Sequence, residues 1–138
     1  PDQVICCDEE GGQTPLNTVI TRSKDIKDAL KIAGTLLESG ANPNHTYGEF
    51  TPLVQAVHVQ DQALVKILLR YGADVNLASP LHSSIIFYNE EIIDLLIEAG
   101  ADINMKNNAA TPRTPLWLAK KNNKTELIEK LINLGAID

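Results

Sequence analysis

The sequence predicts an all-α fold of repeated helix-turn-helix units, and two observations lead to this prediction. A Gly-Ala-Asp/Asn-X-Asn segment occurs three times, and a shortened fourth copy stands at 135–138. Each copy follows a Thr/Ser-Pro-Leu tripeptide, with 21 residues from tripeptide to glycine in three cases and 26 in the first. A fixed internal spacing is the signature of a repeat architecture. The tripeptides begin at Thr14, Thr51, Ser79 and Thr114, and the glycines are Gly40, Gly72, Gly100 and Gly135.

The second repeat shows how each unit is built. Thr51 is suited to cap a first helix, and Pro52 stands at the first helical position, where a missing N–H costs nothing. Apolar residues at helical spacing follow at 53–57 and again at 64–69, which predicts two amphipathic helices. Gly72 then supplies the left-handed conformation that ends a helix.

The other repeats follow the same order. Their apolar stripes lie at 16–20 and 26–37, at 81–85 and 92–97, and at 116–119 and 127–132. The five extra residues of the first repeat fall around Arg22 to Lys27, and we expect them to lengthen the second helix or the turn before it. We expect one domain over 1–138, with a lead-in at 1–13 and repeats at 14–44, 45–76, 77–104 and 105–138.

These motifs resemble the ankyrin repeat, whose unit is about 33 residues long. Thr-Pro-Leu, a small residue three further on and Gly-Ala-Asp-Val-Asn carry the resemblance, which covers nearly the whole chain. It implies a solenoid of stacked antiparallel helix pairs, in which each repeat touches only its neighbours and hairpin loops project sideways. We call these loops fingers; they span 44–51, 76–79 and 104–114, so the middle one is nearly absent. The family's usual histidine after Thr-Pro-Leu occurs only as His82.

The fourth repeat is predicted to be a C-terminal cap. Lys120 and Lys130 replace apolar residues that we expect to face the next repeat. An unpaired ammonium buried there would be very costly, so we expect nothing to pack on that side. The apolar residues at these positions in the inner repeats are Val57, Ile85, Ile67 and Leu95.

Composition argues against several classes of protein. A net charge of −6 disfavours nucleic-acid binding, which depends on Lys and Arg neutralising phosphates. Cys6 and Cys7 are adjacent and make no disulfide framework, which favours a reduced intracellular protein. The longest apolar runs, such as 95–97, are too short to span a membrane, and no secretory leader is recognised. We expect a monomeric cytoplasmic protein, or one that is intracellular after delivery if it is an effector.

No catalytic or metal-binding constellation is evident. His45, His58 and His82 lie on different predicted elements without metal-ligand spacing. Cys6 could be a nucleophile, but no partner base is evident, and an ordinary thiol is the favoured interpretation. We therefore predict that the chain is not an enzyme and has no metal and no cofactor.

Several polar residues are expected to be structural. The resemblance implies that His82 hydrogen-bonds backbone between repeats. Asn44, Asn76 and Asn104 are expected to satisfy loop backbone groups, with a modification of these asparagines as the alternative.

The resemblance implies that a partner protein binds a concave face, formed by the finger tips and the exposed ends of the first helices. The central residues of this strip are Tyr47, Phe50, His58, Val59, Leu77, Ile86 and Phe87. Exposed apolar and aromatic groups mark interaction sites. The alternative is that Phe50 or Phe87 folds into the core, and we expect Tyr88 and Trp117 to be partly buried. Further along the strip lie Glu9, Glu10, Gln13, Thr21, Arg22, Glu49, Ala110, Thr111, Arg113, Lys121 and Asn122.

Charge is uneven along the chain. Six acids and no base lie between Arg70 and Lys106, and bases dominate from Lys106 to Lys130. A solvated helix face explains this, and so does a gradient that steers a partner. The predicted function is non-catalytic protein–protein recognition; the alternative is a targeting or regulatory module of a larger enzyme or effector.

Overall fold

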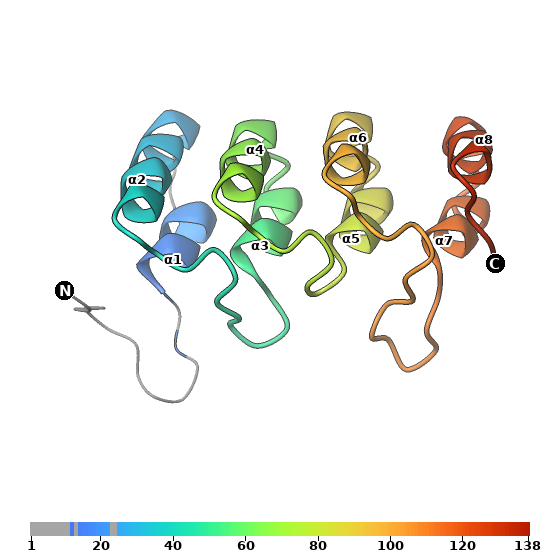
Figure 1. The fold of residues 1–138 in the computed structure, drawn as a ribbon, viewed down its shortest axis with the longest axis horizontal. Helices are drawn as coiled ribbons and strands as arrows, with labels where there is room; N and C mark the ends of the chain where they lie inside the picture. Colours follow the sequence, from blue (N-terminus) through green and yellow to red (C-terminus); the bar gives the residue numbers. More distant parts are fainter. Residues whose placement is uncertain (1–11, 13, 23–24) are drawn as a thin grey trace. The chain divides into compact units, whose positions relative to one another are not determined.

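A computed structural model describes residue 12 and residues 14–22 and 25–138, and these residues form eight α-helices (Figure 1). The predicted lead-in at 1–13 lies almost wholly outside the described residues, together with Cys6, Cys7, Glu9, Glu10 and Gln13. The chain divides into two compact units, Pro1–Asp74 (unit 1) and Val75–Asp138 (unit 2). The helices are α1 (Pro15–Arg22), α2 (Ile26–Glu38), α3 (Pro52–His58), α4 (Gln62–Arg70), α5 (Pro80–Phe87), α6 (Glu90–Glu98), α7 (Pro115–Lys121) and α8 (Thr125–Asn133).

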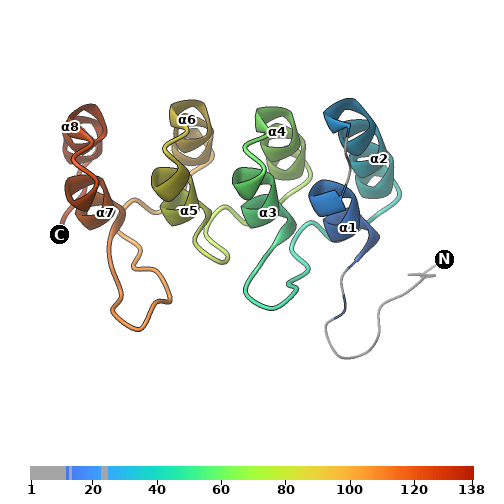
Figure 2. The same ribbon diagram turned by 180° about the vertical axis from the view of Figure 1, so that it is seen from behind.

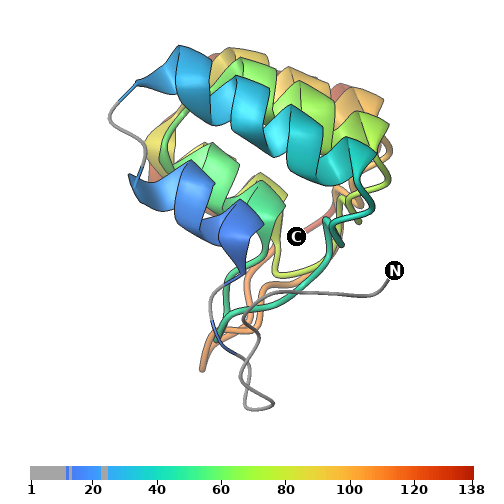
Figure 3. The ribbon, with the colours of Figure 1, turned by 90° about the vertical axis from the view of Figure 1, so that its left-hand side faces the viewer.

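Unit 1 consists of two helix pairs that stack side by side. Helix α1 packs on α2 and α3 on α4, while α1 also contacts α3 and α2 contacts α4. In Figure 3, α1 and α3 form one layer of this unit and α2 and α4 form a second layer. The core between the layers holds the buried side chains that the apolar stripes predict, among them Leu16, Ile20, Leu53, Leu64 and Leu68.

Unit 2 repeats this arrangement. Helix α5 packs on α6 and α7 on α8, and the first helices α5 and α7 lie beside each other (Figure 2). Its core contains Leu81, Ile85, Ile92, Leu96 and Leu131. The four helix pairs match the four predicted repeats, and the predicted all-α class is confirmed.

Three of the four first helices begin with a threonine cap. The Thr51 hydroxyl accepts a hydrogen bond from the Val54 N–H at 3.1 Å, as predicted, and Thr14 and Thr114 do the same for the residues three positions further on. Ser79, the equivalent residue of α5, makes no such bond. The finger before Ser79 is short, since Ser79 stands only three residues after Asn76. Both Ala78 and Ser79 have left-handed backbone, with φ of 61° and 57°. The short connection therefore displaces the serine from capping geometry.

The second helices confirm two further predictions. Helix α2 has 13 residues whereas α4, α6 and α8 have nine each, so the extra residues of the first repeat lengthen its second helix. Gly72 follows α4 with a φ of +87°, the left-handed conformation that ends a helix.

The repeated asparagines join successive turns. The Asn44 amide donates to the carbonyl oxygen of Gly72 at 3.1 Å and accepts from the Asp74 N–H at 2.6 Å. Asn104 makes the equivalent bonds to Gly135 and Ile137, at 3.4 and 2.8 Å. Asn76 accepts from the Asp102 N–H at 2.8 Å. The structural role predicted for these residues is confirmed.

The direction predicted for Lys130 is wrong. Its ammonium group pairs with Asp94 of α6, so it faces the preceding helix pair of unit 2. The same position in α4, Ile67, also faces backward: a Cβ on Gly34 of α2 would lie 3.2 Å from its Cδ1 atom. Lys120 is exposed and pairs with Asp138. The end of the array at the fourth repeat stays a prediction that rests on Lys120 alone.

Candidate partner-binding surface

The finger of unit 1 is a tight hairpin that presents two aromatic side chains. Tyr47 and Phe50 pair through two backbone hydrogen bonds of 2.8 and 3.1 Å. Gly48 between them has a φ of +59°, a conformation that is costly for residues with a Cβ atom. The pairing holds both rings at the surface, with Tyr47 and Phe50 exposed.

Phe50 connects the finger to the end of helix α3. Its ring meets the His58 ring edge-on, with centroids 5.4 Å apart and an interplanar angle of 74°. Such T-shaped pairs are favourable beyond the area that they bury. Burial lowers the pKa of His58, which favours the neutral ring beside Phe50. Val59, the next residue, caps the helix and is exposed.

The exposed apolar residues of unit 2 lie at the end of α5. Ile86 is 60% exposed and Phe87 41% exposed, whereas Leu77 in the short finger is half-buried. Helix α5 ends at Phe87, and Tyr88 follows in the left-handed conformation.

The histidines of the described residues make separate contacts. The Nε2 atom of His82 lies 2.8 Å from the carbonyl oxygen of Arg113, in the finger before α7, which confirms its predicted bond to backbone of the next repeat. Burial lowers the pKa of His82, and this hydrogen bond partly opposes the shift. His45 lies 3.3 Å from the carbonyl oxygen of Gly12. Within the described part of the chain, no three His, Cys, Asp or Glu side chains gather closely enough to hold a metal ion.

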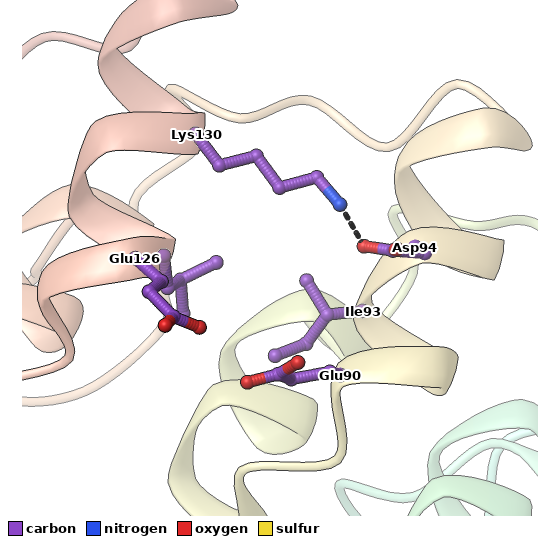
Figure 4. A pocket seen from close by; sticks show the side chains of 6 residues that line it. Glu90, Ile93, Asp94, Glu126 and Lys130 are labelled. Carbon is purple, nitrogen blue, oxygen red and sulfur yellow. Dashed lines mark hydrogen bonds and ion pairs between the residues drawn. The ribbon is translucent and has the colours of Figure 1, made fainter.

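A small pocket lies between α6 and α8 of unit 2 (Figure 4). Its volume is about 150 Å³, below the range of roughly 300–1,000 Å³ that small-molecule sites occupy. Glu90 and Glu126 approach it from the two helices, and the Lys130–Asp94 ion pair lies at one side. The pocket is lined by Glu90, Ile93, Asp94, Glu126, Leu127 and Lys130.

The comparisons with known proteins agree with this architecture. A family model described as ankyrin repeats (3 copies) matches residues 26–107, more than half of the chain. The chain belongs to the ankyrin repeat family. Two similar proteins are the human and the mouse "Ankyrin repeat and MYND domain-containing protein 1", which are 42% and 41% identical over 69 residues. Those residues are 50% of this chain but only 7% and 8% of the relatives.

The predicted surface residues fall into two groups, one in each unit. Tyr47, Phe50, His58 and Val59 belong to unit 1, and the first three form a connected cluster through the hairpin and the ring contact. Leu77, Ile86 and Phe87 belong to unit 2, and only the last two are well exposed. Phe50 and Phe87 are therefore surface residues and not core. Their binding of a partner stays a prediction.

Sequence reasoning missed one cluster on the fourth ankyrin repeat. The Arg113 guanidinium lies 4.4 Å and the Lys121 ammonium 5.1 Å from the centre of the Trp117 ring. Trp117 is half-buried, as expected, and so is Tyr88, which carries the Lys124 ammonium 3.5 Å from its ring centre. The i, i+4 spacing of Trp117 and Lys121 on α7 is a signal that could have revealed the first contact.

Among residues 12, 14–22 and 25–138, no helix combines the length and apolar character needed to cross a membrane.

Proposed function

We propose that this chain binds a partner protein, without catalysis, through the exposed apolar side chains of its fingers and first helices. Ankyrin repeats are generally protein–protein interaction modules, and this chain has four helix pairs of that kind. The observation that carries the proposal is Phe50, which remains 41% exposed although its ring is fixed against His58. An aromatic side chain held rigid at the surface loses little entropy on binding, which is typical of hot-spot residues.

Unit 2 supplies a second binding patch in this proposal. Ile86 and Phe87 are exposed next to each other at the end of α5. Exposed apolar groups that lie next to each other mark interaction sites. This pair fits contact with an apolar side chain of a partner.

The test begins with affinity purification and mass spectrometry to identify a partner, which is then purified. Its affinity is measured by calorimetry for the unaltered chain and for the double variant Phe50→Ala, Phe87→Ala. We expect the variant to bind more weakly by over 2 kcal/mol, the hot-spot scale, or roughly 30-fold. Helical circular dichroism checks that it is folded.

The matched control is Ile132→Ala. Ile132 is also a large exposed apolar residue, but it lies on the second helix α8, outside both patches. Its replacement should leave affinity unchanged. A folded double variant that binds as tightly as the unaltered chain would show that these residues do not carry binding.

The relatives favour a second candidate function. The names of the human and mouse proteins indicate that they also contain a MYND domain, and the matched residues are less than a tenth of their length. We propose as the alternative that these repeats target or regulate a larger protein. Sequencing of the complete transcript tests this: a further domain encoded beside the repeats would support it, and a reading frame limited to repeats would contradict it.

A further inference from the structure

The finger before α7 fixes Arg113 through its backbone. The Arg113 N–H donates to the Asn107 side-chain oxygen at 2.9 Å, and the Arg113 carbonyl oxygen accepts from the Asn107 N–H at 3.1 Å. The same oxygen lies 2.8 Å from Nε2 of the buried His82. The next residue, Thr114, caps α7. Three hydrogen bonds and a helix cap therefore hold the backbone from which the Arg113 side chain projects.

The side chain of Arg113 is positioned as well. Its guanidinium stacks 4.4 Å from the centre of the Trp117 ring, and Lys121 brings a second positive charge to the same ring. Arg113 is half-buried, and its Nε atom is sealed from solvent without an acceptor. The stacked guanidinium is thus already ordered and loses little conformational entropy when it binds a ligand.

Neither cation has a carboxylate partner among the described residues. The ion pairs found there join Lys120 to Asp138 and Lys130 to Asp94. A cation over a ring is attracted by the ring's electron-rich face, but its N–H groups keep their capacity for an anion. Two cations converge here without an anion between them.

We propose that Arg113, Trp117 and Lys121 form the docking position for an Asp or Glu side chain of the partner protein. Arginine presents a planar fork of donors that matches a carboxylate with two parallel hydrogen bonds. Arg and Trp are also the residue types most enriched at hot spots. This inference rests on the proposed function and adds the chemistry of the segment that is recognised.

The neighbouring helix indicates what accompanies the carboxylate. Ile86 of α5 and Lys121 of α7 both stand seven residues after the first residue of their Thr/Ser-Pro-Leu tripeptides. Helices α5 and α7 lie side by side in unit 2. The partner segment therefore carries a bulky apolar residue close to its acidic residue.

Charge favours a protein segment over a nucleic acid at this position. Unit 2 contains six Lys and Arg against eight Asp and Glu. A polyanion would meet this net negative charge along its length, whereas one carboxylate contacts only the local cations.

The test uses a phage-displayed library of random 12-residue peptides, selected on the whole chain. We expect the selected peptides to be enriched in Asp or Glu next to a bulky apolar residue. The best peptide is then labelled and its affinity measured by fluorescence anisotropy, together with a copy in which the acid is replaced by its amide. The acidic peptide should bind about tenfold more tightly.

Three variants make the test specific. Arg113→Lys keeps the charge but removes the fork, and it leaves the backbone bond to His82 in place; it should reduce the preference for the acid to less than about threefold. Lys121→Gln should weaken binding of the acidic peptide and leave binding of the amide copy unchanged. Lys106→Gln, the control, removes an exposed charge of the same unit outside the cluster and should change little.

The outcomes separate this inference from the proposed function. Peptides without acid enrichment, or an acid preference that survives Arg113→Lys, would overturn the carboxylate site. So would a 20-nucleotide single-stranded DNA that binds more tightly than the peptide at 150 mM salt and depends on Arg113. After any of these results, the variant Phe87→Ala decides the fate of the proposed function. If Phe87→Ala abolishes peptide binding, the proposed function stands; if it leaves peptide binding unchanged, both proposals fail.

Discussion

Replacing Asn44 by alanine should test whether the asparagine bonds between turns stabilise the fold. The change removes two hydrogen bonds, to the carbonyl oxygen of Gly72 and from the N–H of Asp74. A hydrogen bond contributes a net 0.5–1.5 kcal/mol, or roughly 1–3 kcal/mol for two. Both bonds are exposed, so water can replace them in part, and we expect a loss of about 1–2 kcal/mol.

Urea unfolding followed by helical circular dichroism measures this loss. Asn108→Ala is the matched control, because Asn108 is an exposed loop asparagine without a hydrogen bond of this kind. Asn104→Ala, which removes the equivalent pair of bonds in unit 2, should resemble Asn44→Ala. If Asn44→Ala is no less stable than Asn108→Ala, the reasoning from the hydrogen bonds is refuted.

Two further predictions concern stability. Thr51→Ala should cost about 1 kcal/mol in the free energy of unfolding because it removes a helix cap, whereas Ser79→Ala should cost far less because Ser79 makes no cap bond; equal losses in urea unfolding would contradict this. Acid should also destabilise the chain through His82, whose pKa is lowered by burial. The neutral ring is favoured in the folded state, so its contribution is complete above the unfolded pKa of about 6.5 and is lost as the pH falls through the folded pKa. Unfolding at pH 7.5 and at pH 5 should show a smaller pH effect in His82→Gln than in the unaltered chain, and an identical effect in both would argue against His82 as the source.

The sequence predicted the helices well because their signals are local. Thr51 and Pro52 begin a helix and Gly72 ends one through effects within a few residues, so one chain segment is enough to recognise them. Ser79 is the position at which such local signals fail. The tripeptide is present, but the short finger gives Ser79 a left-handed backbone, and its side chain makes no cap bond.

Orientation across the stack was harder to predict. The repeat spacing identifies Lys130 as a stacking position, but it does not say whether that position faces the preceding or the following repeat. The exposure of Phe50 and Phe87 depends on how the fingers fold, and the Arg113–Trp117 contact joins a finger to a helix. These features arise from loop conformation, which apolar periodicity does not encode.

The asparagine bonds have a consequence for how the fingers can vary. Asn44 and Asn104 are anchored at one end of their fingers, and Thr51 and Thr114 are anchored as helix caps at the other. Both ends of these loops are thus held by contacts outside the loop itself. Insertions at the tips, between Tyr47 and Phe50 or between Asn107 and Arg113, leave these anchors and the Arg113–His82 bond outside the altered segment, so the two tips are the natural graft sites of this chain. The finger at 76–79, with its strained and uncapped exit at Ser79, does not offer the same freedom.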